Sequence, residues 1–156
     1  MKKKIMVLGI SIIGASIGLS SIAEANIINK CKACHNFTAK KKVGPGWGPG
    51  DTGKGVQRGV FGRVAGSSPG FKYKFTKYIK GEAWSWDEAH LRKWMCNSRN
   101  AVKEFTRDKK AKTKMPPQRV CKIADQDKIL AFMKSLDKQV EKKDSKEVEK
   151  VEDKNS

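Results

Sequence analysis

The sequence predicts an all-α domain with long loops. Apolar residues recur at helical spacing in two segments, near residues 86–97 and near residues 125–136. Residues 40–74 are rich in glycine, proline and lysine and have no apolar period, which predicts turns. No stretch of useful length alternates apolar and polar residues as a half-buried strand does.

The N-terminal segment, residues 1–25, is typical of a secretory signal. Three lysines follow Met1, residues 5–22 are almost entirely apolar, and residues 23–25 read A-x-A, a cleavage site. The apolar run also approaches the length of a membrane span, so an uncleaved anchor formed by residues 5–22 stays open. Basic residues at the start place the following domain on the outer side of the membrane in both cases.

A helix is predicted to lead into Cys31, because Ala23, Ile27 and Cys31 recur at helical spacing. It meets the motif C-x-x-C-H at Cys31, Cys34 and His35, which is the attachment pattern of a c-type haem. Two thiols add to the porphyrin vinyl groups, and the adjacent imidazole becomes the proximal iron ligand. The alternatives are a thioredoxin-type C-x-x-C pair and half of a zinc site.

The second predicted helix begins at Ser85 and runs to about Asn97. Ser85 and Glu88 have the spacing of a capping box, with Ser85 as the N-cap. Leu91, Trp94 and Met95 would then share one apolar face. Residues 99–120 are expected to form a basic loop.

The last helix is predicted over about residues 125–136. Its buried stripe is expected to consist of Ile129, Phe132, Met133 and Leu136. Residues 137–156 carry 6 lysines and 7 acidic residues and no aromatic one, so they are expected to be a disordered tail or a charged extension of this helix.

The charge of the chain is concentrated in one domain, residues 26–136. This domain has 25 Lys and Arg against 8 Asp and Glu, a formal charge of +17. We expect no nucleic-acid binding, because the domain is exported and no binding motif occurs. The basic surface instead indicates acidic protein partners approached by electrostatic steering.

The order of these parts resembles the class I c-type cytochromes, closest to the mitochondrial cytochrome c and bacterial cytochrome c2 group. Beyond C-x-x-C-H, the most specific match is the segment from Gly59 to Arg63, continued by Gly66, Pro69, Gly70 and Tyr73. The resemblance covers roughly residues 27–136. It implies a small cytochrome c fold around one covalently attached haem c.

The resemblance also implies axial ligation of the iron by His35 and Met115. A thioether is a soft, neutral donor that suits low-spin haem iron and raises its reduction potential. Met95 and Met133 are alternative sixth ligands, but both are expected to be core residues. His90 is expected to lie at the surface or to support a ligand residue without binding the iron itself.

Several residues are implied to support the haem. The carbonyl of Pro45, or of Pro49 as the alternative, would accept the Nδ1 proton of His35. The propionates would receive hydrogen bonds from Arg63, Tyr73, Trp86 and Thr113. Trp94 stands where the group usually has tyrosine.

Two further cysteines, Cys96 and Cys121, have no counterpart in the common pattern. In an exported protein an even leftover pair is a candidate disulfide, with two buried free thiols as the alternative.

The predicted function is electron transfer and not enzyme catalysis, because a haem with both axial positions filled has no site for substrate. The resemblance implies a monomeric periplasmic carrier between a quinol–cytochrome c reductase of the bc1 type and a terminal cytochrome oxidase. Lysines at the docking positions would meet acidic surfaces of these complexes: Lys30, Lys114 and Lys122, joined by Lys32, Lys110 and Lys112.

Three alternatives stay open. One is a membrane-anchored or complex-bound cytochrome subunit, which is the only form expected to be held at the membrane. Another is a peroxidase-like enzyme with an open iron position. The third is a zinc module built from the four cysteines Cys31, Cys34, Cys96 and Cys121.

Overall fold

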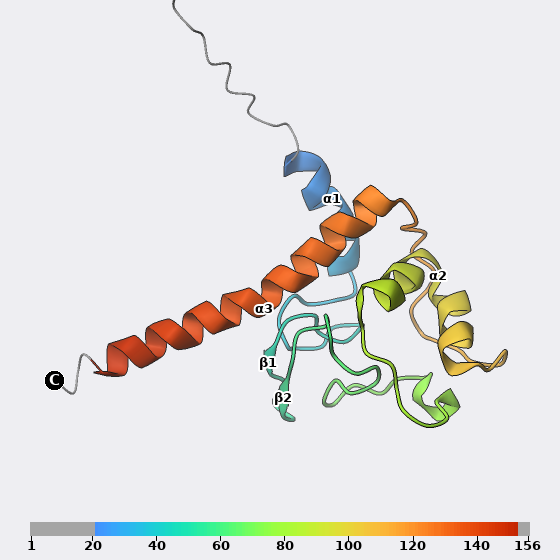
Figure 1. The fold of residues 1–156 in the computed structure, drawn as a ribbon, viewed down its shortest axis with the longest axis horizontal. Coiled ribbons are helices and arrows are strands. Elements are labelled where there is room, and N and C mark those ends of the chain that lie inside the picture. The colour runs from blue at the N-terminus through green and yellow to red at the C-terminus, as the bar shows by residue number, and fades with distance from the viewer. Residues whose placement is uncertain (1–20, 153–156) are drawn as a thin grey trace, which may run out of the picture.

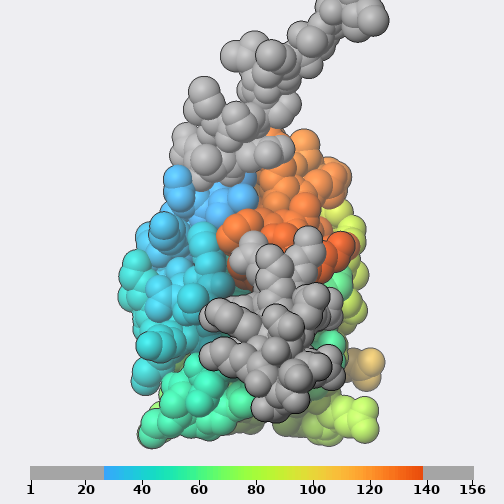
Figure 2. Space-filling view, turned by 90° about the vertical axis from the view of Figure 1, so that its left-hand side faces the viewer, coloured from blue at the N-terminus to red at the C-terminus, as the bar shows by residue number. Residues whose placement is uncertain are grey.

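The structure is a computed structural model that describes the backbone of residues 21–152 and the side chains of residues 27–138. Helices dominate it, as predicted: α1 (Ser21–Lys32), α2 (Glu88–Thr106) and α3 (Ile123–Glu152). Figure 1 shows α1 and α2 on either side of the first part of α3. Both helices contact α3. On one face of the molecule the surfaces of α1 and α3 adjoin (Figure 2).

The long segment between α1 and α2 contains one short ribbon. Strand β1 (Gly50–Asp51) pairs antiparallel with β2 (Val56–Gln57). Gly53, in the connecting turn, has φ +76°, a conformation open to glycine at no steric cost. The remainder of this segment is turns, apart from a 3₁₀ helix at Thr76–Tyr78.

The prediction that Ser85 caps the second helix was wrong. Ser85 forms an isolated antiparallel bridge with Val64, so the chain stays extended at that point. The N-cap is Asp87, whose Oδ1 accepts a hydrogen bond from the backbone N–H of His90 at 2.8 Å. Trp86 therefore precedes the helix.

The predicted end of this helix at Asn97 is an interruption and not an end. Asn97 has φ −148° and ψ 86°, and its Oδ1 accepts from the backbone N–H of Asn100 at 3.1 Å, which caps a second helical stretch. α2 then continues to Thr106, so residues 99–106 are helical and not a loop. The basic loop comprises residues 107–120, which we call the ligand loop because it contains Met115.

The last helix is longer than expected. α3 continues to Glu152, so residues 137–152 extend this helix, which is the second of the two possibilities for the tail. Asp137 has a defined role, because its Oδ1 accepts from the backbone N–H of Gly59 at 3.0 Å.

The core lies between the helices and the long segment that connects α1 to α2. The predicted α3 stripe is confirmed at Ile129, Met133 and Leu136, which are buried, while Phe132 is partly buried against Phe37. The predicted α2 face is confirmed as well, because Leu91, Trp94 and Met95 are all buried.

The proposed signal or anchor lies mostly outside the described residues. α1 begins at Ser21 and includes the expected cleavage site after Ala25. Within residues 21–152, no helix combines the length and the apolar character needed to cross a membrane.

Candidate haem site

A large cavity opens between α1, α2, α3 and the loops. Its empty volume is about 1190 Å³, counting the solvent at its mouth. Side chains from all three helices and from the loops line it, an extent suited to a large cofactor and not to a single ion. Most of its wall is apolar, and Cys31, Cys34, His35 and Met115 all line it.

The two motif cysteines are placed by the end of α1. The chain turns back on itself after Lys32, where the N–H groups of Cys34 and His35 both bond to the carbonyl of Cys31, at 3.1 and 2.9 Å. Burial, followed by the neighbouring Cys34, raises the pKa of Cys31 to about 11. A reactive thioredoxin-type cysteine needs the opposite shift, toward thiolate. Cys31 therefore does not have the lowered pKa that such a pair depends on.

His35 is held with one nitrogen committed and the other left for a ligand. Its Nδ1 donates to the carbonyl of Pro45 at 2.8 Å, so Nε2 carries the lone pair. Pro45, rather than Pro49, is thus the partner in this structure. Burial lowers the pKa of His35 and favours the neutral imidazole that metal ligation requires.

Gly44 provides the space for this ring. A Cβ at residue 44 would lie 2.5 Å from Cε1 of His35, a distance that no side chain can occupy. On another side, the His35 ring lies 5.1 Å from the ring of Trp47. Sequence reasoning did not identify Gly44, because the chain offers several glycines in this region and no pattern distinguishes one of them.

Met115 is held by three hydrogen bonds. Its Sδ accepts from Nε1 of Trp94 at 2.9 Å, and its carbonyl accepts from Oγ of Ser98 at 2.8 Å. Its N–H donates to Oγ1 of Thr113 at 3.2 Å. Met95 and Met133 also line the cavity, but both are more than nine-tenths buried among core residues.

The residues expected at the propionates also line the cavity: Arg63, Tyr73, Trp86 and Thr113. Arg63 is only 4% exposed, and its guanidinium donates to two backbone carbonyls, those of Arg58 and Gly46. Burial lowers the pKa of Arg63 and raises that of Tyr73. A buried cation and a neutral phenol beside an apolar cavity are suited to carboxylates that must be satisfied away from water.

These observations fit a c-type haem and do not fit zinc. The cavity offers two thiols, a neutral imidazole, a thioether and a buried cation within apolar walls. Cys96 and Cys121 are joined by a disulfide with a Cα–Cα distance of 4.6 Å, which removes them from a zinc tetrad. In the described part of the chain, no group of three or more His, Cys, Asp and Glu side chains could hold a metal ion.

The lysines expected at the docking surface are not all at the cavity mouth. Lys30 and Lys114 line the cavity, whereas Lys122 is exposed and lies outside its lining. Lys72 and Lys74 line it as well, and sequence reasoning missed both of them. Their positions in a turn-rich segment carry no local signal.

His90 lies away from the cavity lining. Its Nδ1 is 2.8 Å from Oδ1 of Asp87, and its ring packs against Phe105 at 4.8 Å. It therefore belongs to the start of α2, in agreement with the expected surface position.

Comparison with known proteins gives consistent matches, although no protein-family model matches the chain. The chain is 35% identical over 103 residues to cytochrome c2 of Rhodomicrobium vannielii, which covers 60% of this chain and 73% of that protein. It is 32% identical over 118 residues to cytochrome c2 of Afifella marina, covering 74% and 81%.

Solved structures agree. The structure of cytochrome c2 from Rhodobacter sphaeroides is 30% identical, with a TM-score of 0.57, covering 74% of this chain and 94% of that one. That of cytochrome c2 from Rhodospirillum centenum has a TM-score of 0.55 at 22% identity and matches in fold. The predicted fold class, the single covalent haem c and the assignment to electron transfer are thereby confirmed, and the chain belongs to the cytochrome c2 family of class I c-type cytochromes.

Proposed function

We propose that this protein is a periplasmic carrier whose haem iron is ligated by His35 and Met115. The observation that carries the proposal is the pairing of a neutral imidazole, with Nδ1 bonded to Pro45, and a fixed thioether in the lining of one cavity. When bound through Cys31 and Cys34, the haem supplies a one-electron couple between ferric and ferrous iron.

The protein residues then set the conditions for this couple. His35 and Met115 would hold the iron from the protein side, and the haem would then exchange electrons without substrate binding at the iron. Arg63, Tyr73 and Trp86 line the cavity and would donate hydrogen bonds to the propionates, because buried carboxylates need such donors. Arg63 also supplies an opposite charge in a site with little water.

The proposed route runs from a quinol–cytochrome c reductase of the bc1 type to a terminal cytochrome oxidase. The support for it is the formal charge of +17 on residues 26–136, together with the exposed lysines Lys30 and Lys114 at the cavity mouth. Such contacts favour fast encounter and fast release, which a mobile carrier requires. Lys122 would extend this surface.

In this proposal residues 1–25 direct export and are then removed, which leaves a soluble monomer. The competing form keeps residues 5–22 as an anchor on the outer face of the inner membrane. Mass spectrometry of the native protein distinguishes the two forms, because a cleaved chain begins at Asn26 and carries one haem.

Two measurements test the function. The visible spectrum should show a c-type α-band in the ferrous protein and the weak thioether-to-iron absorption at the red end in the ferric protein. The purified ferric protein should be reduced by bc1-type membranes with quinol and reoxidised by an oxidase preparation. A protein that reacts with neither complex, or that copurifies in fixed ratio with one, would contradict a mobile carrier and support a bound subunit.

A further inference from the structure

The disulfide Cys96–Cys121 lies where α2 is interrupted, directly beside the segment that follows Met115. Asn97 breaks the helix, so the carbonyls of Met95 and Cys96 bond outside the helix. They accept hydrogen bonds from the N–H groups of Val120 and Arg119, at 3.2 and 3.1 Å. The interruption therefore creates a docking edge for the end of the ligand loop.

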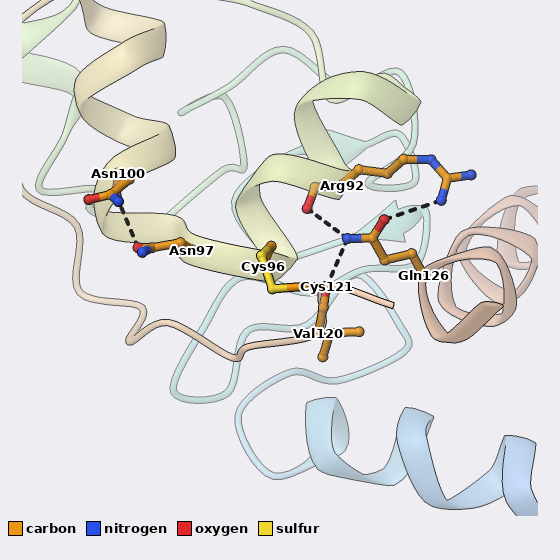
Figure 3. The surroundings of a disulfide bond; sticks show 7 residues. All are labelled: Arg92, Cys96, Asn97, Asn100, Val120, Cys121 and Gln126. Atoms are coloured by element: carbon orange, nitrogen blue, oxygen red, sulfur yellow. Dashed lines mark hydrogen bonds between the residues drawn. A yellow bond between two sulfur atoms is a disulfide. The ribbon is translucent and has the colours of Figure 1, made fainter. Parts of the chain in front are cut away.

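The disulfide fixes the chain at this edge, as Figure 3 shows. A buried glutamine supports the same junction: Nε2 of Gln126 donates to the carbonyls of Val120, at 2.8 Å, and Arg92, at 3.1 Å. The junction thus joins α2, the end of the ligand loop and the start of α3.

Met115 is connected to this junction by a short and stiff stretch of chain. Pro116 and Pro117 follow it directly, and their rings fix φ. The sulfur and the carbonyl of Met115 accept hydrogen bonds from Trp94 and Ser98, which belong to the same part of α2 as Cys96. One short region of α2 therefore holds both the sulfur of Met115 and the end of the ligand loop.

The two cysteines differ in exposure. Cys121 is an exposed residue, whereas Cys96 is partly buried. An external thiolate attacks a disulfide at the sulfur that it can reach, so Cys121 is the expected point of attack.

We propose that the Cys96–Cys121 disulfide is a positioning element for Met115, and that its reduction by a dithiol opens the iron to small ligands. In the reduction step the S–S bond accepts two electrons and two protons and becomes two thiols, while the dithiol closes to its own disulfide. The inference rests on Met115 being the sixth ligand, as proposed above. The hydrogen bonds of Trp94 and Ser98 to Met115 do not involve the disulfide and oppose its displacement, so the expected effect is a larger minor population with Met115 displaced and not an unfolded protein.

Carbon monoxide binding to the ferrous protein tests this proposal. Ascorbate reduces the iron and leaves the disulfide intact, whereas ascorbate with dithiothreitol reduces both. The disulfide joins two residues that are 25 positions apart in the sequence and so closes a loop that contains Met115. Because its loss frees the ligand loop, the population with Met115 displaced should rise, and carbon monoxide should bind at least about tenfold more tightly after dithiothreitol.

Two variants control the experiment. C96A/C121A should bind carbon monoxide tightly with or without dithiothreitol, which separates loss of the disulfide from other actions of the reagent. Asp87→Ala removes the cap of α2 and none of the contacts of the junction, and its affinity should stay at the level of the ascorbate-treated native protein. If C96A/C121A yields no folded protein, the two treatments of the native chain decide alone, with thiol content measured by alkylation and mass spectrometry.

Three results would overturn the inference. One is equal affinity before and after verified reduction of the disulfide. Another is a disulfide that dithiothreitol leaves intact in the folded protein. The third is tight carbon monoxide binding with ascorbate alone and no thioether absorption in the ferric state, which would refute Met115 ligation itself and is thus distinguishable from the first two.

Discussion

The indole Nε1 of Trp94 donates a hydrogen bond to the Sδ of Met115, over 2.9 Å. The indole itself is fixed in the core, with its ring 4.9 Å from the ring of Trp86. With Met115 as the sixth ligand, as proposed above, a donor aimed at its sulfur would withdraw electron density from the thioether and make it a weaker donor to iron. Ferric iron depends more on that donation than ferrous iron does, so this hydrogen bond should raise the reduction potential.

Trp94→Phe should therefore lower the reduction potential. The decrease is about 40 mV if the hydrogen bond stabilises the ferrous protein relative to the ferric protein by about 1 kcal/mol. Trp94→Tyr is the matched variant, since it differs from phenylalanine by one hydroxyl donor and should recover part of the loss. Redox titration of the three proteins gives the comparison. Equal potentials for the Phe and Tyr variants would show that packing, and not the donor, sets the value.

Met115→Ala should abolish the thioether absorption of the ferric protein and lower the potential by more than Trp94→Phe does, because the neutral sulfur ligand is lost. Met133→Leu and Met95→Leu are the controls. Both residues line the same cavity but are packed in the core, and leucine replaces methionine at similar volume. If the absorption survives in Met115→Ala and disappears in either control, the assignment of Met115 is wrong.

The parts of the site that sequence could predict are those whose chemistry is local. The spacing of Cys31, Cys34 and His35 is set by covalent attachment within one turn of chain, and Met115 lies in a loop motif with family resemblance. The stripe of α3 was predictable for a related reason, because burial of one helix face imposes a period on consecutive residues.

The errors occurred where distant segments decide the local structure. Ser85 has the right residue type for a cap, but its backbone pairs with Val64, and this contact displaces the cap to Asp87. Residues 99–106 continue α2 because Asn97 caps a second stretch while the carbonyls before it bond to residues 119 and 120. The sequence does pair Cys96 with Cys121 as a candidate disulfide, but nothing in it shows that the carbonyls of residues 95 and 96 leave the helix to bond to residues 119 and 120. The same holds for Lys72 and Lys74 at the cavity mouth.

The cap at Asp87 predicts a specific pH dependence of stability. The backbone N–H of His90 is the largest factor that holds the pKa of Asp87 below its usual value. A carboxyl with a lowered pKa in the folded state stabilises the fold above its unfolded pKa, and this contribution is lost as pH falls through the folded value. Asp87→Ala should lower the free energy of unfolding by about 1 kcal/mol near pH 6.

Asp87→Asn is the control for this prediction, because asparagine caps the helix without titrating. Denaturant unfolding of the native protein and of Asp87→Asn should give a difference in free energy at pH 6 that shrinks as the pH approaches 2. Comparison of these two proteins cancels the titration of the other carboxylates. A difference that stays constant over this range would show that the ionised carboxylate does not contribute.

Electron transfer to an oxidase should depend on where the positive charges lie, and not only on their number. The Debye length is ~10 Å at 0.1 M salt, so lysines at the cavity mouth act on a partner that approaches there, while distant lysines are screened. Lys30→Glu, Lys74→Glu and Lys114→Glu should each slow oxidation by about threefold or more at low salt. Lys40→Glu changes the net charge equally at an exposed position outside the cavity lining, and should have a smaller effect.

Stopped-flow oxidation over a range of salt concentrations measures this, and the differences among the variants should vanish as the Debye length falls toward ~3 Å at 1 M. Removal of residues 141–156 should change the rate little, because that segment is nearly neutral in formal charge. The truncation must leave Asp137 in place, since its carboxylate accepts a hydrogen bond from the backbone N–H of Gly59, at the start of the segment from Gly59 to Arg63. A rate indifferent to salt would refute steering by the cavity-mouth lysines. A rate lost with residues 141–156 would also refute it, and would indicate instead that the partner holds this protein through its C-terminal helix.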